Sequence, residues 1–477
     1  MQTPVIAVID VGKTNKKVFL FDRQYQLVWE RSTQLTETVD EDGDPCEDLE
    51  QLIRWALEAV QDVMKLPEYD VQALNFTTYG ASFVFVDKDG KTVGCLTNYL
   101  KPYPDELRDQ FYEQYGPTAQ LSVKTASPAL DSLNSGLQLY RLKHERADLF
   151  SQVAYALHLP QYMSYLITSE PVAEVTSIGC HTMLWDFQQA DYHQWVKQER
   201  LDACLSILAP SDSVKKVLVD GKPLKVGVGL HDSSSALIPY LASFREPFVL
   251  ISTGTWCISM NPFNTDPLTA EELQYDCLCY LTYKGQPVKA SRLFAGNEHE
   301  QQTKRLSAHF NVPESYYKQV GYNADIIDQL QRTHAIEAEP NNDHANEWLG
   351  MTPPATIPPF TQSAFVRRDL TLFPDYETAY HQLMLDLMAQ QLISTALVIP
   401  GDSVGPISRI FVDGGFSHNS IYMNLLAAAF PDVDIWAASV AQATSLGAAL
   451  AIHDEWNAGP VPSDLIDLTY YPAPQAD

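Results

Sequence analysis

Two segments half a chain apart share one layout, and this repeat constrains the fold more than any other feature of the sequence. Residues 5–21 hold an apolar, β-branched run, a polar turn around Gly12 and a second apolar run. Residues 247–260 repeat the order of strand, small polar turn and strand around Gly254. Each pattern predicts two strands joined by a turn. The repeat predicts two similar domains, residues 1–245 and residues 246–477.

The length and charge of the chain narrow its class. It has 477 residues, 32 of them basic and 60 acidic, which gives a formal charge of −28 at pH 7. At about 150 residues per domain, this length corresponds to two or three domains with a large core. The acidic excess opposes binding to nucleic acid and to anionic lipid, so we expect no nucleic-acid partner. A phosphorylated ligand is still compatible, because a few backbone amides and one cation can hold a phosphate.

The lack of a recognisable targeting signal and the pattern of cysteines favour a cytoplasmic protein. The chain starts without a basic segment, and no window of about 20 apolar residues follows, so we expect no secretory signal and no membrane partner. The seven scattered cysteines suggest reduced thiols. Cys277 and Cys279 are expected to be buried on one face of a strand rather than to bind metal, because no second ligand pair lies nearby. The sequence is compatible with a homodimer and defines no oligomeric state.

Alternating strand and helix patterns favour an α/β fold. Besides the two hairpins, apolar runs predict strands over residues 72–87 and 409–412. Residues 335–360 are rich in proline, asparagine and acids, which predicts a long loop or insertion. Apolar residues at helical spacing predict helices over residues 47–65, 133–150, 159–168, 376–398, 418–430 and 440–453.

Three glycine-containing turns each follow an apolar strand, at Gly12–Asn15, Ser252–Thr255 and Asp413–Gly415. Glycine lets the backbone approach a ligand closely, and hydroxyls and free amides can hold phosphate oxygens. A glycine turn after a strand is usually only a turn, but three of them in two similar halves favour a phosphate site. The sequence contains no P-loop motif, and no dinucleotide fingerprint follows the first strand.

Asp232 is the most informative acid in the sequence. It follows Gly229 in the segment GLHD and precedes three serines and an apolar run with helical character. One interpretation is that Asp232 only caps that helix. The other is that it acts as a general base at a helix N-terminus, where backbone amides can also hold an anion. Asp10 stands in a similar place at the end of the first strand, and two such acids beside phosphate turns suggest Mg²⁺-assisted phosphoryl transfer.

Five ordered motifs resemble those of the FGGY family of carbohydrate kinases, and the resemblance covers nearly the whole chain. It implies the actin-like, RNase H-like ATPase fold, with two similar domains and a cleft between them. Lys13 stands where the family usually has threonine or serine, and Gln442 stands where glutamate is usual. The segments that carry the resemblance are DVGKTNKK at 10–17, GLHD at 229–232, STGTW at 252–256, DGGFSHN at 413–419 and QATSLGAA at 442–449.

Within that family the sequence resembles the kinases of L-rhamnulose and L-fuculose. Gly254, Thr255 and Trp256 look typical of this branch, and residues 78–87 resemble a second segment of it. Ser82 stands where the branch has a substrate-contacting aspartate. Residues 98–100 (NYL) stand where the branch often has YRD. Both changes remove charge from the expected sugar pocket and leave the identity of the sugar open.

The resemblance implies an ATP-dependent transfer of phosphate to a sugar hydroxyl, with Asp232 as the general base and Mg-ATP as the donor. Asp10 and Asp232 are the expected Mg²⁺ ligands. Two alternatives stay open: a pentulose or polyol kinase of the same family, and an inactive protein that senses sugar or nucleotide. The residues expected to bind ATP are Gly12, Lys13, Thr14, Asn15, Lys17, Thr253, Gly254, Thr255, Gly414, Gly415 and Asn419. The residues expected to contact the sugar are Tyr79, Gly80, Ser82, Asn134, Gln161, Thr176, His231 and Asp232.

Overall fold

Two seven-stranded sheets form the framework of the protein, one in each half of the chain. The computed structural model describes residues 2–337, 362–399, 406–440 and 442–474. In the N-terminal sheet, β15 (Leu230–His231) pairs with β6 beside the main strand path. That path runs in the order β13 (Val214–Val219), β14 (Lys222–Gly227), β6 (Tyr69–Thr78), β1 (Thr3–Val11), β2 (Lys16–Phe21) and β3 (Leu27–Thr33).

The C-terminal sheet repeats the central arrangement of the N-terminal one. β1 pairs antiparallel with β2 and parallel with β6, and β16 pairs antiparallel with β17 and parallel with β20. The two predicted hairpins and the predicted α/β fold are therefore confirmed. The C-terminal strand order is β18 (Cys277–Leu281), β19 (Pro287–Leu293), β17 (Cys257–Asn261), β16 (Phe248–Thr253), β20 (Arg409–Gly414), β21 (Asp434–Ser439) and β22 (Asp467–Tyr471).

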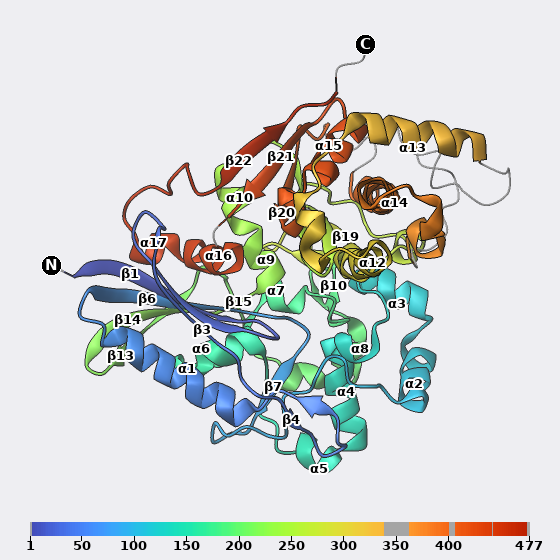
Figure 1. Ribbon diagram of the computed structural model, residues 1–477. Coiled ribbons are helices and arrows are strands. Elements are labelled where there is room, and N and C mark those ends of the chain that lie inside the picture. The colour runs from blue at the N-terminus through green and yellow to red at the C-terminus, as the bar shows by residue number, and fades with distance from the viewer. Residues whose placement is uncertain (1, 338–361, 400–405, 441, 475–477) are drawn as a thin grey trace.

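Short helices lie between the two sheets (Figure 1). They are α9 (Asp232–Ala236), α10 (Ile238–Ser243), α16 (Ala443–Ala451) and α17 (His453–Trp456). One buried cluster joins both sheets to these helices and includes Ile6 of β1, Leu250 of β16 and Leu446 of α16. Because this apolar layer is continuous, its burial stabilises the two halves together.

Glycine at position 447 allows α9 and α16 to pack closely. A Cβ atom at Gly447 would lie 1.9 Å from the carbonyl oxygen of Ser235 on α9. Cβ atoms do not approach other atoms so closely, so a larger residue would push the two helices apart. Asn75 of β6 adds a contact on the same side, since its Nδ2 donates to the Ala448 carbonyl at 2.8 Å. Helix α16, from the last part of the chain, therefore packs on the N-terminal sheet.

Longer helices cover the outer faces of the sheets. On the N-terminal side, α1 (Leu49–Met64) buries an apolar stripe with α6 (Leu159–Thr168), and Asp48 caps α1 by accepting from the Gln51 amide at 2.9 Å. On the C-terminal side, α14 (Tyr376–Ala396) is buried almost all round. Its neighbours in that core are α12 (Ala295–Phe310), α13 (Ala324–Glu337) and α15 (Ser420–Ala429).

A mainly helical region extends from the N-terminal sheet (Figure 1). Its core is aromatic, with Phe111, Tyr140 and Trp195 packed edge to face. Its helices are α2 (Asp105–Tyr115), α3 (Thr118–Thr125), α4 (Ser135–Glu145), α5 (Ala147–Phe150) and α8 (Gln194–Gln198). The short helix α7 (Val175–Ile178) lies beside β15 instead. One further short α-helix is α11 (Ala270–Leu273), and the remaining short strands of the described residues are β4 (Thr38–Val39), β5 (Pro45–Cys46), β7 (Phe83–Val86), β8 (Tyr155–His158), β9 (Ala173–Glu174), β10 (Trp185–Asp186), β11 (Asp191–Tyr192) and β12 (Leu208–Ala209).

Two of the predicted elements were wrong in extent. The strand expected over residues 72–87 is two strands, because the chain leaves the large sheet after Thr78 and β7 pairs with β8 instead. The helix expected over residues 133–150 is divided into α4 and α5 at Arg146, whose backbone is not helical. Most of the loop expected over residues 335–360 lies outside the described residues, and its first three residues end α13.

Other expectations on the chain are met, and one stays open. Cys277 and Cys279 are buried in one apolar cluster, as predicted. Within the described ranges, no helix is both long and apolar enough to span a bilayer. The domain boundary near residue 245 stays a prediction, and the packing of α16 and α17 on the N-terminal sheet shows that the two halves share helices across it.

Candidate active site

The site begins where three neighbouring parallel strands end. β1 and β15 flank β6, and in their registers Asp10 pairs with Thr77 while His231 pairs with Thr78. Asp232 follows His231 directly as the first residue of α9, and its Oδ1 accepts from the Ser233 amide at 2.6 Å. The carboxyl ends of parallel strands meet at one edge of a sheet. This edge therefore brings together Asp10 and Asp232, the two acids that the sequence singled out.

Asp10 is buried and hydrogen-bonded from the other half of the chain. Its Oδ2 accepts from Thr444 Oγ1 at 2.6 Å and from Ser445 Oγ at 2.8 Å, both in the first turn of α16. Burial raises the pKa of the Asp10 carboxyl, the two hydroxyls lower it, and the negative charge of Asp232 raises it further. Two carboxyls within electrostatic reach of each other repel when both are ionised, and a divalent cation would relieve that repulsion.

Asp232 lies against a buried imidazole. His231 Nε2 is 3.1 Å from Asp232 Oδ1 and 3.1 Å from Cys180 Sγ. Burial alone would raise the pKa of Asp232, but the contact with His231 outweighs it and lowers that pKa. Burial disfavours the charged imidazole, yet Cys180 and Asp232 raise the pKa of His231 to about 10. The side chain of Asp232 is still 32 % exposed, so an ionised carboxylate is presented to a substrate.

The first glycine turn joins β1 to β2, and the three lysines in and beside it have different partners. The Gly12 amide donates to the Asn15 carbonyl at 2.9 Å and closes the turn. Lys16 is buried and forms an ion pair of 2.7 Å with Glu47. Lys17 pairs with Asp10 in the strand register and lowers the pKa of that carboxyl. Lys13 extends away from the strand to Glu37, with its Nζ 2.8 Å from Oε1.

The other two turns border one pocket in the C-terminal half. Its volume is about 620 Å³, large enough for much of a nucleotide. Four predicted ATP residues line it: Thr253, Gly254, Gly415 and Asn419. The side chain of Asn419 has a structural partner set as well, because its Oδ1 caps α15 and its Nδ2 donates to a buried tyrosine hydroxyl.

Several residues of this pocket were not anticipated. Gly296, His299, Tyr317, Gly321 and Phe416 line it, and the first two belong to the segment AGNEH that begins α12. A Cβ atom at Gly296 would lie 1.8 Å from the Gly254 carbonyl oxygen. The sequence carries only a weak signal for this segment, because β19 contains Lys289 and Arg292 and is not an apolar run, and Gly296 lies in the first turn of α12.

Two of the predicted sugar residues are buried and hydrogen-bonded to the backbone. Asn134 Nδ2 donates to the His181 carbonyl at 2.7 Å, and its Oδ1 accepts from the Leu130 amide at 2.7 Å. Gln161 Nε2 donates to the Gly229 carbonyl at 2.8 Å. Gln161 therefore supports the loop that leads to Asp232. Direct sugar contacts by either residue stay predictions.

Two of the remaining predicted sugar residues, Thr176 and Gly80, contact His231. Thr176 Oγ1 accepts from the His231 amide at 3.0 Å, and a Cβ atom at Gly80 would lie 2.9 Å from His231 Cδ2. Tyr79 precedes Gly80, and Ser82 is buried with its Oγ 3.4 Å from the Thr97 carbonyl oxygen. Segment 79–82 is thus a wall beside the catalytic edge.

Trp256, which follows the second glycine turn, pairs with an arginine of the C-terminal sheet that the sequence did not reveal. Trp256 is 41 % exposed and packs on Phe294, and the guanidinium of Arg292 lies 5.4 Å from the centroid of the Trp256 indole ring. Arg292 is also held by a bidentate ion pair with Asp276, at 2.7 Å and 3.0 Å. Arginine on an aromatic face is a stable pairing. The lone arginine of β19 carried no sequence pattern that could have revealed it.

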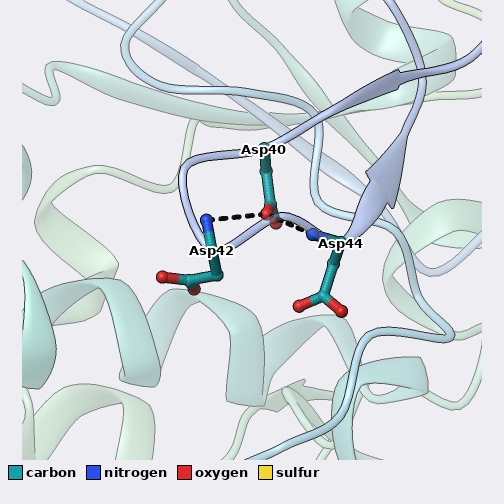
Figure 2. Close-up of side chains that lie close together, drawn as sticks. All are labelled: Asp40, Asp42 and Asp44. Atoms are coloured by element: carbon teal, nitrogen blue, oxygen red, sulfur yellow. Dashed lines mark hydrogen bonds between the residues drawn. The ribbon is translucent and has the colours of Figure 1, made fainter.

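A second acidic cluster lies apart from this edge. Asp40, Asp42 and Asp44 gather their carboxylates within 4.8 Å, and the Asp42 and Asp44 amides both donate to Asp40 at 3.0 Å (Figure 2). The ammonium of Lys101 lies among them, 2.5 Å from Asp40 and 2.6 Å from Asp42. It holds the pKa of both carboxyls below their usual range. A lysine therefore supplies the positive charge that a metal would bring.

The fold and the two acids define a sugar-kinase-like architecture, and comparison with known proteins identifies the family. The chain belongs to the FGGY family of carbohydrate kinases: the family's N-terminal domain matches residues 5–208 and its C-terminal domain matches residues 245–335. The resemblance stated from the five motifs is therefore confirmed.

Individual relatives are distant. L-fuculokinase from Escherichia coli K12 is 24 % identical over 281 residues, which cover 54 % of this chain and 57 % of that protein. Rhamnulokinase from Pectobacterium carotovorum is 26 % identical over 217 residues, or 42 % of each chain. The match thus spans little more than half of the first relative. A carbohydrate kinase structure from Novosphingobium aromaticivorans has a TM-score of 0.78 at 22 % identity, covering 99 % of this chain and 95 % of that one, and it confirms the two-domain actin-like fold.

Proposed function

We propose that the protein transfers the γ-phosphate of ATP to a hydroxyl of a sugar, a ketose such as L-rhamnulose or L-fuculose. One observation carries this proposal. Asp10 and Asp232 lie at one sheet edge beside the first glycine turn, and the other two glycine turns border a nucleotide-sized pocket in the opposite half. An acceptor over Asp232 and a nucleotide in that pocket would meet between the two domains.

Asp232 is the general base in this proposal. Its carboxylate is partly exposed, and the contact with His231 keeps it ionised at neutral pH. It would accept the hydroxyl proton as that oxygen attacks the γ-phosphorus, while ADP leaves with the electrons of the broken bond. His231 fixes the orientation of the carboxylate, and the positive charge of its imidazolium offsets the negative charge of Asp232. Closure of the two domains about the segment near residue 245 would exclude water from the reaction.

The donor set at this edge fits Mg²⁺. Asp10 and Asp232 supply hard carboxylate oxygens, and Mg²⁺ usually takes one or two carboxylates together with phosphate oxygens. When bound, the ion would neutralise charge on the donor's phosphates. Gly12, Thr14, Asn15 and Lys17 of the first hairpin would hold the phosphates on one side. Thr253, Gly254, Thr255, Gly414, Gly415 and Asn419 would hold the nucleotide on the other.

The choice of a 6-deoxyketose rests on the relatives and on sequence motifs. L-fuculokinase and rhamnulokinase are among the curated proteins that the chain resembles. Ser82 is a neutral residue in the wall beside His231, so hydroxyl contacts there would be made without a carboxylate. The first candidates for contacts with the acceptor are Asp232 itself and, in the segment beside His231, Tyr79 and Gly80.

The test is ADP release with ATP, Mg²⁺ and a panel of L-rhamnulose, L-fuculose, L-ribulose, D-ribulose, D-xylulose and glycerol. We expect a rate on one 6-deoxyketose, and we expect Asp232→Asn to lower that rate by about 10²- to 10⁴-fold. An unchanged ATP-induced rise in melting temperature controls for folding in the variant. A rate on a pentulose or glycerol alone would contradict the 6-deoxyketose, and near-normal turnover by Asp232→Asn would remove the role of that residue.

A further inference from the structure

Lys13 has surroundings that separate it from the other charges of the first hairpin. Lys17 is the register partner of Asp10, and Lys16 forms a buried ion pair with Glu47. Lys13 lies outside the residues that line the nucleotide-sized pocket. Its side chain is 25 % exposed and leaves the turn in the direction of Glu37.

The ammonium of Lys13 is held between two aromatic rings. Its Nζ is 5.9 Å from the centroid of the Tyr79 ring and 5.8 Å from that of Tyr99. The two rings are 6.0 Å apart and meet edge to face. Attraction to both ring faces, together with the 2.8 Å ion pair with Glu37, fixes the position of the charge.

The same two tyrosines come from segments that meet beside His231, the residue that precedes Asp232. Tyr79 follows Thr78, the register partner of His231, and the next residue, Gly80, touches the His231 ring. Tyr99 comes from the neighbouring segment, which also supplies the Thr97 carbonyl near Ser82. The ammonium therefore belongs to the wall formed by segments 79–82 and 97–99.

Lys13 also has donor capacity to spare. An ammonium has three N–H donors. Over the residues that the structure describes, Glu37 is the one hydrogen-bonding or ion-pair partner of Lys13 Nζ. The side chain is held by these contacts and is still 25 % exposed, so the remaining donors are accessible to a ligand.

We propose that Lys13 is a specificity-determining residue of the acceptor site, whose ammonium donates to a hydroxyl or carbonyl oxygen of the bound sugar rather than to the phosphates of ATP. This assignment rests on the proposed sugar kinase function and deepens it. It also changes the role that the first turn suggested for Lys13, because the turn holds the backbone near the phosphates while the side chain reaches the other substrate.

The test uses Lys13→Met, which keeps an unbranched apolar side chain and removes the charge, and Lys13→Arg, which keeps the charge. The full-length wild type and variants are assayed on the sugar that the wild type phosphorylates. We expect Lys13→Met to raise KM for the sugar about tenfold or more while KM for ATP changes less than about twofold. Lys13→Arg should recover part of the loss. Lys17→Met, from the same hairpin, is the matched comparison and should affect kcat or KM for ATP instead.

The outcomes separate this inference from the function on which it rests. A wild type that phosphorylates no sugar of the panel would overturn both. An active wild type whose Lys13→Met variant keeps its KM for the sugar would overturn the role of Lys13 alone. A raised KM for ATP with an unchanged KM for the sugar would return Lys13 to the phosphate side. Melting temperatures within about 2 °C of wild type show that the effects are local.

Discussion

Thr444 Oγ1 donates to Asp10 Oδ2 at 2.6 Å, although the two residues are 434 positions apart in the chain. The bond links the first turn of α16 to the end of β1, and Ser445 adds a second donor at 2.8 Å. A carboxylate that burial would otherwise neutralise is thereby kept closer to its charged form. Through this contact the end of the chain shapes the electrostatics of a site built mostly by the first half.

Thr444→Val removes one of the two donors with little change in volume. A hydrogen bond to a charged group contributes about 1.5–3 kcal/mol, so we expect the proposed Mg²⁺ ligand to bind its cation more weakly and kcat/KM for Mg-ATP to fall about tenfold. The measurement is the Mg²⁺ dependence of ADP release. Thr371→Val is a matched control, because Thr371 also donates to an aspartate, Asp369 at 2.8 Å, on an exposed turn. Equal behaviour of the two variants would argue against a role for the Thr444 bond.

Gly447→Ala tests the packing that carries Asp232. The new Cβ would lie 1.9 Å from the Ser235 carbonyl oxygen, so α9 and α16 must separate. We expect a loss of about 1–3 kcal/mol in the free energy of unfolding by urea, the usual range for overpacking, together with reduced turnover because α9 begins at Asp232. Gly459→Ala is the control, since its Cβ would meet nothing nearer than 3.4 Å. Comparable unfolding curves for the two variants would contradict close packing at Gly447.

Patterns local in sequence predicted the strands and turns well. The apolar runs at β1 and β16 and the glycines after them are local signals, and the two hairpins follow from them. The helix over residues 159–168 matches α6 at both ends. The meeting of Asp10 with Asp232 depends on parallel strands that are far apart in the chain. The sequence suggested a joint role from the place of each acid beside a glycine-containing segment and from the motif resemblance, but it did not give the strand registers.

Side-chain partners were the part that the sequence could not supply. The side-chain amides of Asn134 and Gln161 donate to backbone carbonyls. Residue spacing does not reveal these partners, because they come from loops far away in the sequence. The strand predicted over residues 72–87 failed for a related reason. Its apolar residues are buried throughout, but Phe83–Val86 pair with β8 and not with the large sheet. Burial therefore runs through two separate strands, and the apolar pattern could not show where the first one ends.

Lys16 and Glu47 form a second long-range contact, and its loss should be costly. Their side chains are 1 % and 4 % exposed and lie 2.7 Å apart under the first turn. Lys16→Met leaves the Glu47 charge buried without its partner, so we expect a loss of about 3–5 kcal/mol in unfolding free energy. Lys304→Met is the control, because Lys304 and Glu300 are 52 % and 64 % exposed and such pairs contribute at most about 1 kcal/mol.

A Lys16→Met/Glu47→Leu double variant identifies the cause of that loss. It removes the stranded carboxylate, so it should unfold at a higher urea concentration than Lys16→Met alone. If the double variant is the less stable of the two, packing and not the unpaired charge accounts for the effect.

His158 should make stability depend on pH. The ring stacks on Phe83 with centroids 4.0 Å apart, and Nε2 lies 3.0 Å from Ser135 Oγ. Burial, with a contribution from the charge of His231, lowers the pKa of His158 to about 3. In the unfolded chain a histidine has a pKa of about 6.5, so between these values the unfolded state binds the extra proton. The stabilisation is thus complete above the unfolded pKa and is lost as the pH falls towards the folded one.

The variant His158→Phe keeps an aromatic ring and cannot titrate. Urea unfolding of wild type and variant at pH 7 and pH 5 isolates the contribution of this one side chain. The wild type should lose about 2 kcal/mol more than the variant over that interval, because the imidazole takes up its proton only on unfolding. Identical losses in the two proteins would mean that His158 can be protonated in the folded state, which its apolar surroundings and its stacking on Phe83 oppose.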